Sequence, residues 1–465
     1  MDDAKMTTET PSFTLPDILR QPKAEVEALQ DRLLQTMVQL CYDHHPYYSK
    51  LMRAEGLKPD HIRTRADLKR LPPSSKKEFL ADPEAFRLRP EGLPGNEGIL
   101  WKVIYTTGTT TGKPAPIFVT AHDHFAYMFA FQDRRELVGL TDADRVANLF
   151  PMTGFPMGAF SRAADEAGAI GAAIMFGNTG RTDSMFPVNR SLDSAVVAIA
   201  RHRATVLWGV AGFVRRILIR AQETGADFSS VRMVMTTGEA SSPAMREDFR
   251  ERMRNLNCAD TQIVNRYGST EQGGTMIECC EGSGFHSALP DQLYHEVVDD
   301  ETGKRLADGE SGMLAFSHLN RRGTVFLRYK MGDVGSLTHD SCPHCGRTSV
   351  RLSSKPTRTG DIVKIRGALV NLGNLKEEFD RMNGIDEYQI VVASENPSDP
   401  FSMDELVIRL APAQGRASDM SDVMVEEVKR LTNLRPRIEL VERDKIYDPT
   451  SPAKPKRIVD QRLAR

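Results

Sequence analysis

Apolar and polar residues alternate along this chain with two different periods, and the change of period marks out its parts. Residues 24–54 carry apolar residues at helical spacing and predict one long helix that ends before Gly56; these residues are Val26, Leu29, Leu33, Leu34, Met37 and Leu40. From about residue 100 to residue 275, short β-rich runs alternate with helical stretches that include 193–202 and 211–224. The runs are ILWKVIYTT, RVANLFP, AAIMFG, ATVLWGV, VRMVMTTG and TQIVNRYG. This alternation predicts βαβ units and parallel sheets.

The second half of the chain has a different pattern. Between 293 and 338, β-rich stretches are separated by the turns DETG and ADGESG, which predicts hairpins. After KPTRTGD come a helix (374–382), the strands YQIVVAS and ELVIRLA, a helix (420–432) and the strand RIELVER. We therefore expect an α/β protein in three parts. They are a flexible tail at 1–23, a large domain of parallel or mixed sheets with helices and a β-rich part at 24–357, and a small mobile α+β domain at 358–465.

Length and composition agree with a globular protein of more than one domain. A chain of 465 residues is longer than one hydrophobic core usually supports, and 40% hydrophobic with 27% charged residues is an ordinary balance. The 61 Lys and Arg residues nearly balance the 63 Asp and Glu residues, so no nucleic-acid partner is expected. The longest apolar stretch, 167–177, is shorter than the roughly 20 residues of a membrane span. Residues 1–13 do not resemble a signal peptide, so we expect a cytoplasmic protein with no membrane partner.

Four of the six cysteines lie in two short segments. The segment CPHC supplies Cys342 and Cys345 with the spacing of a metal knuckle, and ECCEGSGFH supplies Cys279 or Cys280 together with His286. Three thiolates and one imidazole make a closed tetrahedral zinc site of the structural type. A redox pair or plain buried thiols are the alternative.

The stretch YTTGTTTGKPAPIF, residues 105–118, combines small hydroxyls and glycines with one lysine. Such a loop suits a phosphate chain, because backbone N–H groups, hydroxyls and an ammonium can converge on its oxygens. It differs from the G-x-x-x-x-G-K-[ST] loop, since one residue is missing between Gly108 and Gly112 and Pro114 replaces the final hydroxyl residue. An ordinary polar loop between strands is the alternative.

Five further segments follow this loop in a fixed order: TTGEA (236–240), NRYGSTEQGG (265–274), YKMGDVG (329–335), RTGDIVKIRG (358–367) and SPAKPKR (451–457). Together they resemble the adenylate-forming superfamily, which includes acyl-CoA synthetases, peptide-synthetase adenylation domains and luciferases. The segment HPYYSKLMRAEGLKPDHIRTRADLKRLPPSSKKEFL and the cysteine clusters look like the phenylacetate–CoA ligase branch, some members of which hold a zinc. The resemblance covers nearly the whole chain from about residue 25.

The resemblance implies an AMP-forming acid–thiol ligase. It would use ATP to convert a carboxylic acid to an acyl-adenylate with release of pyrophosphate, and then pass the acyl group to coenzyme A. The branch implies an aromatic or arylacetic acid, and Phe150, Phe155 and Trp208 are candidates for its pocket, with core packing as the alternative. Transfer to a carrier-protein thiol or to an amine stays open, as do a non-catalytic nucleotide-binding protein and a homodimer.

The resemblance also implies roles for single residues. The phosphate loop would hold the β- and γ-phosphates through Thr106, Thr107, Gly108, Thr109, Thr110, Thr111, Gly112 and Lys113. Glu271, which ends the Tyr-Gly-x-Thr-Glu match with Gly268 and Thr270, would carry magnesium. Tyr267 would lie against the adenine, along a strip made by Gly238, Glu239 and Ala240. Asp333, assisted by Arg358, would accept hydrogen bonds from the ribose hydroxyls.

Two catalytic features belong to the C-terminal part in this resemblance. Lys454 would reach over to the substrate carboxylate and the α-phosphate, and the loop at Gly367 would face the thiol after the small domain rotates. Three positions depart from the family pattern: Thr109 replaces a common glycine, Ala453 replaces the glycine before the lysine, and Gly360 replaces the hinge aspartate. A glycine can absorb a large change of φ and ψ, so we expect a loose hinge at this position.

Overall fold

A nine-stranded mixed sheet forms the centre of the molecule. The structure is a computed structural model, and it describes residues 15–106, 114–150, 158–177, 191–238, 241–258, 260–353, 355–358, 362–365, 368–396, 403–413, 417–432, 434–447 and 456–464. The strand order of this sheet is β13-β14-β9-β8-β7-β6-β5-β3-β4. Adjacent strands from β4 to β7 are parallel and those from β7 to β13 are antiparallel.

The parallel half has the βαβ organisation that the sequence predicts. Its strands are β3 (Arg145–Asn148), β4 (Ala173–Phe176), β5 (Val206–Gly209), β6 (Met233–Thr237) and β7 (Gln262–Tyr267). The helices between them are α6 (Gly158–Ile170), α7 (Leu192–Arg201), α8 (Ala211–Thr224) and α9 (Pro243–Asn255). The expected helices at 193–202 and 211–224 are thus confirmed to within a residue. Side chains on both faces of the central strands β5 and β6 are buried, which explains why these strands read as continuous apolar runs.

Antiparallel strands make up the rest of the large part. The nine-stranded sheet continues through β8 (Met276–Glu278), β9 (Phe285–Ser287), β14 (Arg351–Leu352) and β13 (Leu337–Thr338). A separate sheet contains β10 (Leu293–Val298), β11 (Gly312–His318), β12 (Tyr329–Gly335) and β15 (Thr357–Arg358). The strands β1 (Leu100–Tyr105) and β2 (Pro116–Thr120) form a hairpin. The expected β-rich part is present, but residues 324–328 of the run TVFLRYK belong to no strand.

The prediction of one long helix over 24–54 is wrong. The segment forms two helices, α1 (Lys23–His44) and α2 (Pro46–Ala54), which are separated at His45. His45 has φ −109° and ψ 110°, the extended backbone that a residue before proline prefers, and its side chain accepts a hydrogen bond from the Tyr48 N–H to cap the second helix. The helices α3 (Lys76–Ala81), α4 (Ala121–Asp133) and α5 (Arg135–Val138) follow, and none of the described helices is long and apolar enough to cross a bilayer.

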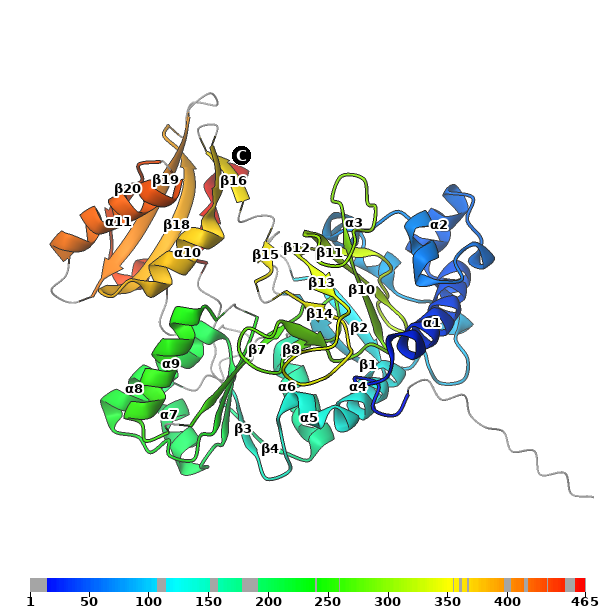
Figure 1. Cartoon of the computed structure of the whole chain (residues 1–465), viewed down its shortest axis with the longest axis horizontal. Coiled ribbons are helices and arrows are strands. Elements are labelled where there is room, and N and C mark those ends of the chain that lie inside the picture. Colours follow the sequence, from blue (N-terminus) through cyan, green and yellow to red (C-terminus); the bar gives the residue numbers. More distant parts are fainter. Residues whose placement is uncertain are drawn as a thin grey trace, which may run out of the picture.

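The C-terminal residues form a smaller α+β unit with its own core. Its elements are β16 (Ile362–Ile365), β17 (Ala368–Asn371), α10 (Leu372–Arg381), β18 (Ile385–Ser394), β19 (Asp404–Pro412), α11 (Ala417–Thr432), β20 (Arg437–Leu440), α12 (Arg443–Ile446) and β21 (Ile458–Asp460). In Figure 1 this unit lies beyond β15 and beside α9. Arg216 of α8 donates a 2.9 Å hydrogen bond to the Tyr447 hydroxyl and so joins the two parts. The expected fold class is confirmed.

A buried ion pair ties the N-terminal segment to the second sheet. The Arg328 guanidinium, 1% exposed, donates to Glu296 on β10 at 2.9 Å and to the carbonyl oxygens of Leu71 at 2.8 Å and Gly303 at 2.7 Å. One buried cation therefore connects the segment at Leu71 to β10 and to the turn that follows it.

Replacing Glu296 with alanine should lower the free energy of unfolding by about 3–5 kcal/mol, because the variant leaves the Arg328 charge buried without a counterion. Urea unfolding followed by circular dichroism measures this loss. The matched control is Glu247→Ala, since Glu247 is 60% exposed and its ion pair with Arg254 lies in solvent, where such a pair is worth about 1 kcal/mol at most. Equal losses in both variants would contradict the role given to Glu296.

Candidate active site

The carboxyl ends of β6 and β7 bring the first predicted residues together. The two strands are adjacent and parallel, so the residues that follow them lie at one edge of the sheet, where ligands bind in open α/β sheets. Gly238 follows β6 with φ +85° and is exposed, a conformation and a lack of side chain that leave its backbone accessible to a flat ring. Tyr267 ends β7.

A hydrogen bond connects this edge to the second sheet. The Tyr267 hydroxyl donates to Oδ2 of Asp333 on β12 at 2.7 Å, although the two residues are 66 positions apart. Asp333 is 9% exposed and pairs along the strand with Arg358 of β15. Tyr267, Asp333 and the backbone of Arg358, three positions expected around the adenosine, therefore lie side by side.

The turn after β7 positions the predicted magnesium ligand. A Cβ on Gly268 would lie 2.7 Å from the carbonyl oxygen of Gly274, so the turn closes only with glycine at this position. Thr270 packs against Gly158 at the start of α6, where an added Cβ would lie 3.2 Å from its side chain. Glu271 is 7% exposed, and its carboxylate is an oxygen ligand of the kind that magnesium prefers.

Lys76 is a site residue that the sequence analysis missed. Its Nζ lies 3.8 Å from Oε1 of Glu271, and it occupies the first position of α3. A cation at a helix N-terminus opposes the helix dipole, and this unfavourable placement is the signal that could have identified it.

The hairpin of β1 and β2 holds the ends of the expected phosphate loop. The Thr106 N–H donates to the carbonyl oxygen of Ala115, and the Ala115 N–H donates to Oγ1 of Thr106, both at 3.0 Å. The described residues thus define the base of the loop. Other predicted positions lie outside the described residues, namely 107–113, Phe155, Glu239, Ala240, Gly360, Gly367 and Lys454, and so does the side chain of Arg358.

The two described aromatic candidates for the acid pocket are core residues of the parallel sheet. Phe150 and Trp208 are 2% and 3% exposed, with ring centroids 6.3 Å apart. The Trp208 indole N–H donates to Oγ1 of Thr237 at 3.2 Å, and the Arg266 guanidinium lies 4.5 Å from the Trp208 ring centroid. Their role as pocket residues stays a prediction.

The predicted metal ligands converge at the antiparallel end of the large sheet. Ligand atoms of Cys279, His286, Cys342 and Cys345 all lie within 4.8 Å of one another. Two of these separations are 3.8 Å between Sγ of Cys279 and Sγ of Cys342 and 3.5 Å between Sγ of Cys345 and Nε2 of His286. Cys280 is exposed and lies outside this group. Of the two neighbouring cysteines that the sequence offers as ligands, Cys279 is therefore the one placed beside the other three residues.

The imidazole in this cluster is arranged to act as a ligand. Burial, with the positive charges of Arg351 and Arg347, lowers the pKa of His286 to about 4, so the ring is neutral near pH 7. Its Nδ1 lies 3.4 Å from Oγ of Ser349, which leaves Nε2 facing the thiols. The cluster joins residues beside β8, β9 and β14 and can therefore stabilise the end of the sheet.

Two comparisons at the level of sequence agree with this geometry. The family model described as AMP-binding enzyme matches residues 22–320. The phenylacetate-coenzyme A ligase of Thermus thermophilus is 27% identical over 91% of both chains. That of Escherichia coli is 24% identical over 82% of both chains.

Solved structures share the fold over the whole chain. A 2-hydroxyisobutyryl-CoA ligase in the postadenylation state superimposes with a TM-score of 0.78 at 20% identity, covering 100% of this chain and 96% of the ligase. The same ligase in the thioesterification state gives a TM-score of 0.64 at 21% identity, covering 97% and 93%. With a family match that extends over more than half of its residues, the chain belongs to the AMP-binding enzyme family.

Proposed function

We propose that this protein activates a carboxylic acid with ATP, forming an acyl-adenylate and pyrophosphate, and transfers the acyl group to coenzyme A. The hydrogen bond of Tyr267 to Asp333 beside Gly238 is the observation that carries the proposal, because it joins residues expected around adenosine at the carboxyl edge of the sheet. The names of the relatives, phenylacetate-coenzyme A ligases, support the thiol acceptor and an aromatic or arylacetic acid.

Alignment and charge stabilisation account for the first half-reaction. A carboxylate oxygen of the acid attacks the α-phosphorus, the bond to the bridging oxygen breaks, and pyrophosphate leaves with its electron pair. This step needs positioning and cations but no nucleophile from the protein. Glu271 would hold a magnesium ion, which neutralises phosphate charge when bound. The loop 107–113 would orient the leaving group, and Lys454 would stabilise charge at the carboxylate and the α-phosphate.

The second half-reaction requires the C-terminal unit to present another face. The thiol sulfur attacks the acyl carbon, and AMP leaves with the oxygen of the broken bond. Gly360 lies between the last strand of the second sheet and β16, so it would absorb the rotation and bring the loop at Gly367 toward the thiol.

We also propose that the cluster of Cys279, His286, Cys342 and Cys345 binds one structural zinc ion. Three thiolates and a neutral imidazole fit the closed tetrahedral coordination of such sites. Four protein ligands leave no open position for water or a substrate, which supports a structural role.

Exchange of labelled pyrophosphate into ATP, measured with a panel of aromatic and arylacetic acids, tests the first half-reaction. We expect exchange with at least one acid, followed by thioester formation when coenzyme A is added. ATP binding without exchange for any acid would contradict the proposal and favour a non-catalytic nucleotide-binding protein.

Replacing Lys454 with alanine should lower the rate of exchange on the order of 10²–10³-fold with little change in ATP binding, since charge stabilisation in the transition state is lost. Lys456→Ala is the matched control, because Lys456 is an exposed lysine two positions further along. Exchange at the wild-type rate in the Lys454 variant would refute this assignment.

Metal analysis of the purified protein should find about one zinc ion per chain. Cys342→Ser should lose the zinc and show a lower melting temperature, because metal binding contributes directly to folding. Cys280→Ser is the control and should keep both, since Cys280 lies outside the cluster. A metal-free protein of undiminished stability would show that the cluster has another role.

A further inference from the structure

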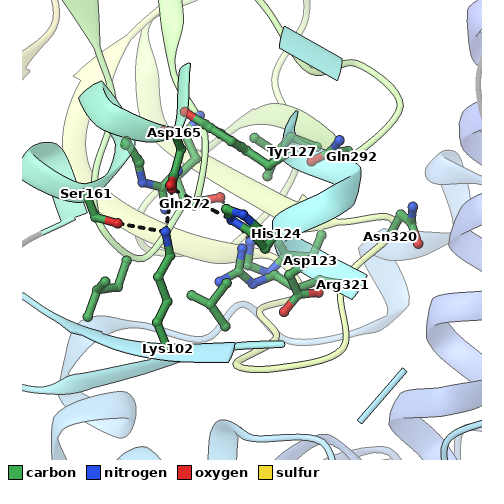
Figure 2. Close-up of a pocket in the computed structure, with 16 residues that line it drawn as sticks. Lys102, Asp123, His124, Tyr127, Ser161, Asp165, Gln272, Gln292, Asn320 and Arg321 are labelled. Atoms are coloured by element: carbon green, nitrogen blue, oxygen red, sulfur yellow. Dashed lines mark hydrogen bonds and ion pairs between the residues drawn. The ribbon is translucent and has the colours of Figure 1, made fainter. Parts of the chain in front are cut away.

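A polar pocket adjoins the candidate active site on the side of α4 and α6. Figure 2 shows Lys102 of β1, His124 of α4, and Ser161 and Asp165 of α6 around it. Gln272 and Gly273, the residues directly after Glu271, also line the pocket, as does Arg321. The pocket therefore begins one residue beyond the proposed magnesium ligand.

Two guanidinium groups converge on one point in this pocket. A Cβ placed on Gly273 would lie 2.5 Å from Nη1 of Arg321 and 3.6 Å from Nη2 of Arg162. Gly273 has φ +69°, so both its backbone conformation and this close approach favour glycine. Two like charges that approach the same point repel each other, and an anion between them would relieve the repulsion.

The carboxylates of the pocket are already engaged by other groups. Asp123 accepts hydrogen bonds from the backbone N–H groups of Arg322 at 2.7 Å, Gly323 at 2.9 Å and Thr120 at 3.0 Å. Asp165 accepts from Lys102, which also donates to Oγ of Ser161 at 2.7 Å. Among the described residues neither of these carboxylates accepts a hydrogen bond from Arg162 or Arg321, although the charge of Asp123 acts on Arg321 and that of Glu166 acts on Arg162.

Several buried polar atoms of the pocket have no hydrogen-bond partner among the described residues. They are Nη1 of Arg162, Nη2 of Arg321 and Oε1 of Gln272. Arg321 is 8% exposed and Gln272 is 1% exposed, so water reaches neither freely. The amide nitrogen of Gln272 contacts Nε2 of His295 at 2.7 Å. The nitrogen and oxygen of a glutamine amide can be interchanged by turning the group over, so the atom without a partner can be a donor or an acceptor. Buried polar groups need a partner, and three of them around one pocket are groups that a bound ligand can satisfy.

The histidines of the pocket do not add charge to it. Burial and the nearby Arg321 hold the pKa of His318 well below its ordinary value, and burial also lowers the pKa of His124. Burial lowers the pKa of Arg321. The negative charge of Asp123 offsets this effect only in part, and the positive charge of Arg162 lowers the pKa further. The guanidinium groups are therefore the charged groups left for a ligand.

We propose that this pocket binds a carboxylate-sized oxyanion between Arg162 and Arg321, with Gln272 as a third contact. Planar guanidinium groups match the geometry of a carboxylate and form strong charge-assisted hydrogen bonds with it. Since the pocket adjoins Glu271, one source of the oxyanion is a second carboxylate of the acid that the enzyme activates, and this assignment rests on the proposed function. The other source is a free inorganic or organic anion.

Thermal unfolding without nucleotide tests the site independently of turnover. Sodium succinate, formate and phosphate are compared with sodium chloride at equal ionic strength. At least one oxyanion should raise the melting temperature, by about 3 °C at 100 times its dissociation constant. Arg321→Met and Arg162→Met should each abolish this rise.

The melting temperature of these variants in chloride is a second readout. Arg321→Met removes a buried charge that Asp123 offsets only in part, and the variant should still fold. Arg87→Met is the control, because Arg87 is half-buried over the Phe118 ring at 4.6 Å and lies outside the pocket, and it should keep the full response. No stabilisation of the wild type by any oxyanion, or an unchanged response in both pocket variants, would overturn the proposal.

Pyrophosphate exchange distinguishes the two sources. Phenylacetic acid is compared with carboxyphenylacetic acid, in wild type and in Arg321→Met. A KM at least 10-fold lower for the dicarboxylic acid, lost in the variant, identifies the oxyanion as part of the substrate. No such preference, together with stabilisation that depends on Arg321, identifies a free anion and also supports the site. If no acid is exchanged, the proposed function fails while the thermal measurement still decides whether the site exists.

Discussion

The contact between Tyr267 and Asp333 joins the two halves of the candidate active site. Tyr267 ends β7 and Asp333 lies within β12, so the 2.7 Å hydrogen bond also fixes how the parallel edge of the large sheet meets β12. Gly238, Thr270 and Glu271 are positioned by the same edge, because they follow the adjacent strands β6 and β7. A shift of this contact would move the adenosine site relative to the proposed magnesium ligand.

Buried cations organise the surroundings of this site in two different ways. Arg328 is saturated, since a carboxylate and two carbonyl oxygens accept its hydrogen bonds, and it serves packing. The Arg321 side chain donates from Nε to the carbonyl oxygen of Thr324, while its Nη2 has no partner among the described residues. Arg328 therefore belongs to a structural ion pair, whereas Arg321 keeps a nitrogen that a ligand can bind.

The sequence predicts the parallel half of the fold well because each element there has a strong local signal. The helix at 211–224 has clear periodicity and ends at Gly225, and the strands are short apolar runs between turns. The long N-terminal helix was overpredicted, because the periodicity continues across Pro46 although its ring interrupts the helix. The cysteine spacing predicts Cys342, Cys345 and His286 with either Cys279 or Cys280, and the fold brings Cys279 to the other three. Lys76 carries only the local signal of a cation at the start of a helix, and its contact with Glu271 is distant in sequence. Arg321 could not be predicted, since its role depends on Arg162, which is also distant in sequence.

The central claim is that a carboxylate oxygen of the acid attacks the α-phosphorus of ATP. An acid labelled with ¹⁸O in its carboxylate, chosen as one that supports exchange, tests this claim when it is turned over with ATP and coenzyme A. Mass spectrometry of the products should find one ¹⁸O atom in AMP and none in pyrophosphate, because the bond from the acyl carbon to oxygen breaks in the second step. Label in inorganic phosphate with formation of ADP, or AMP without label, would contradict the account.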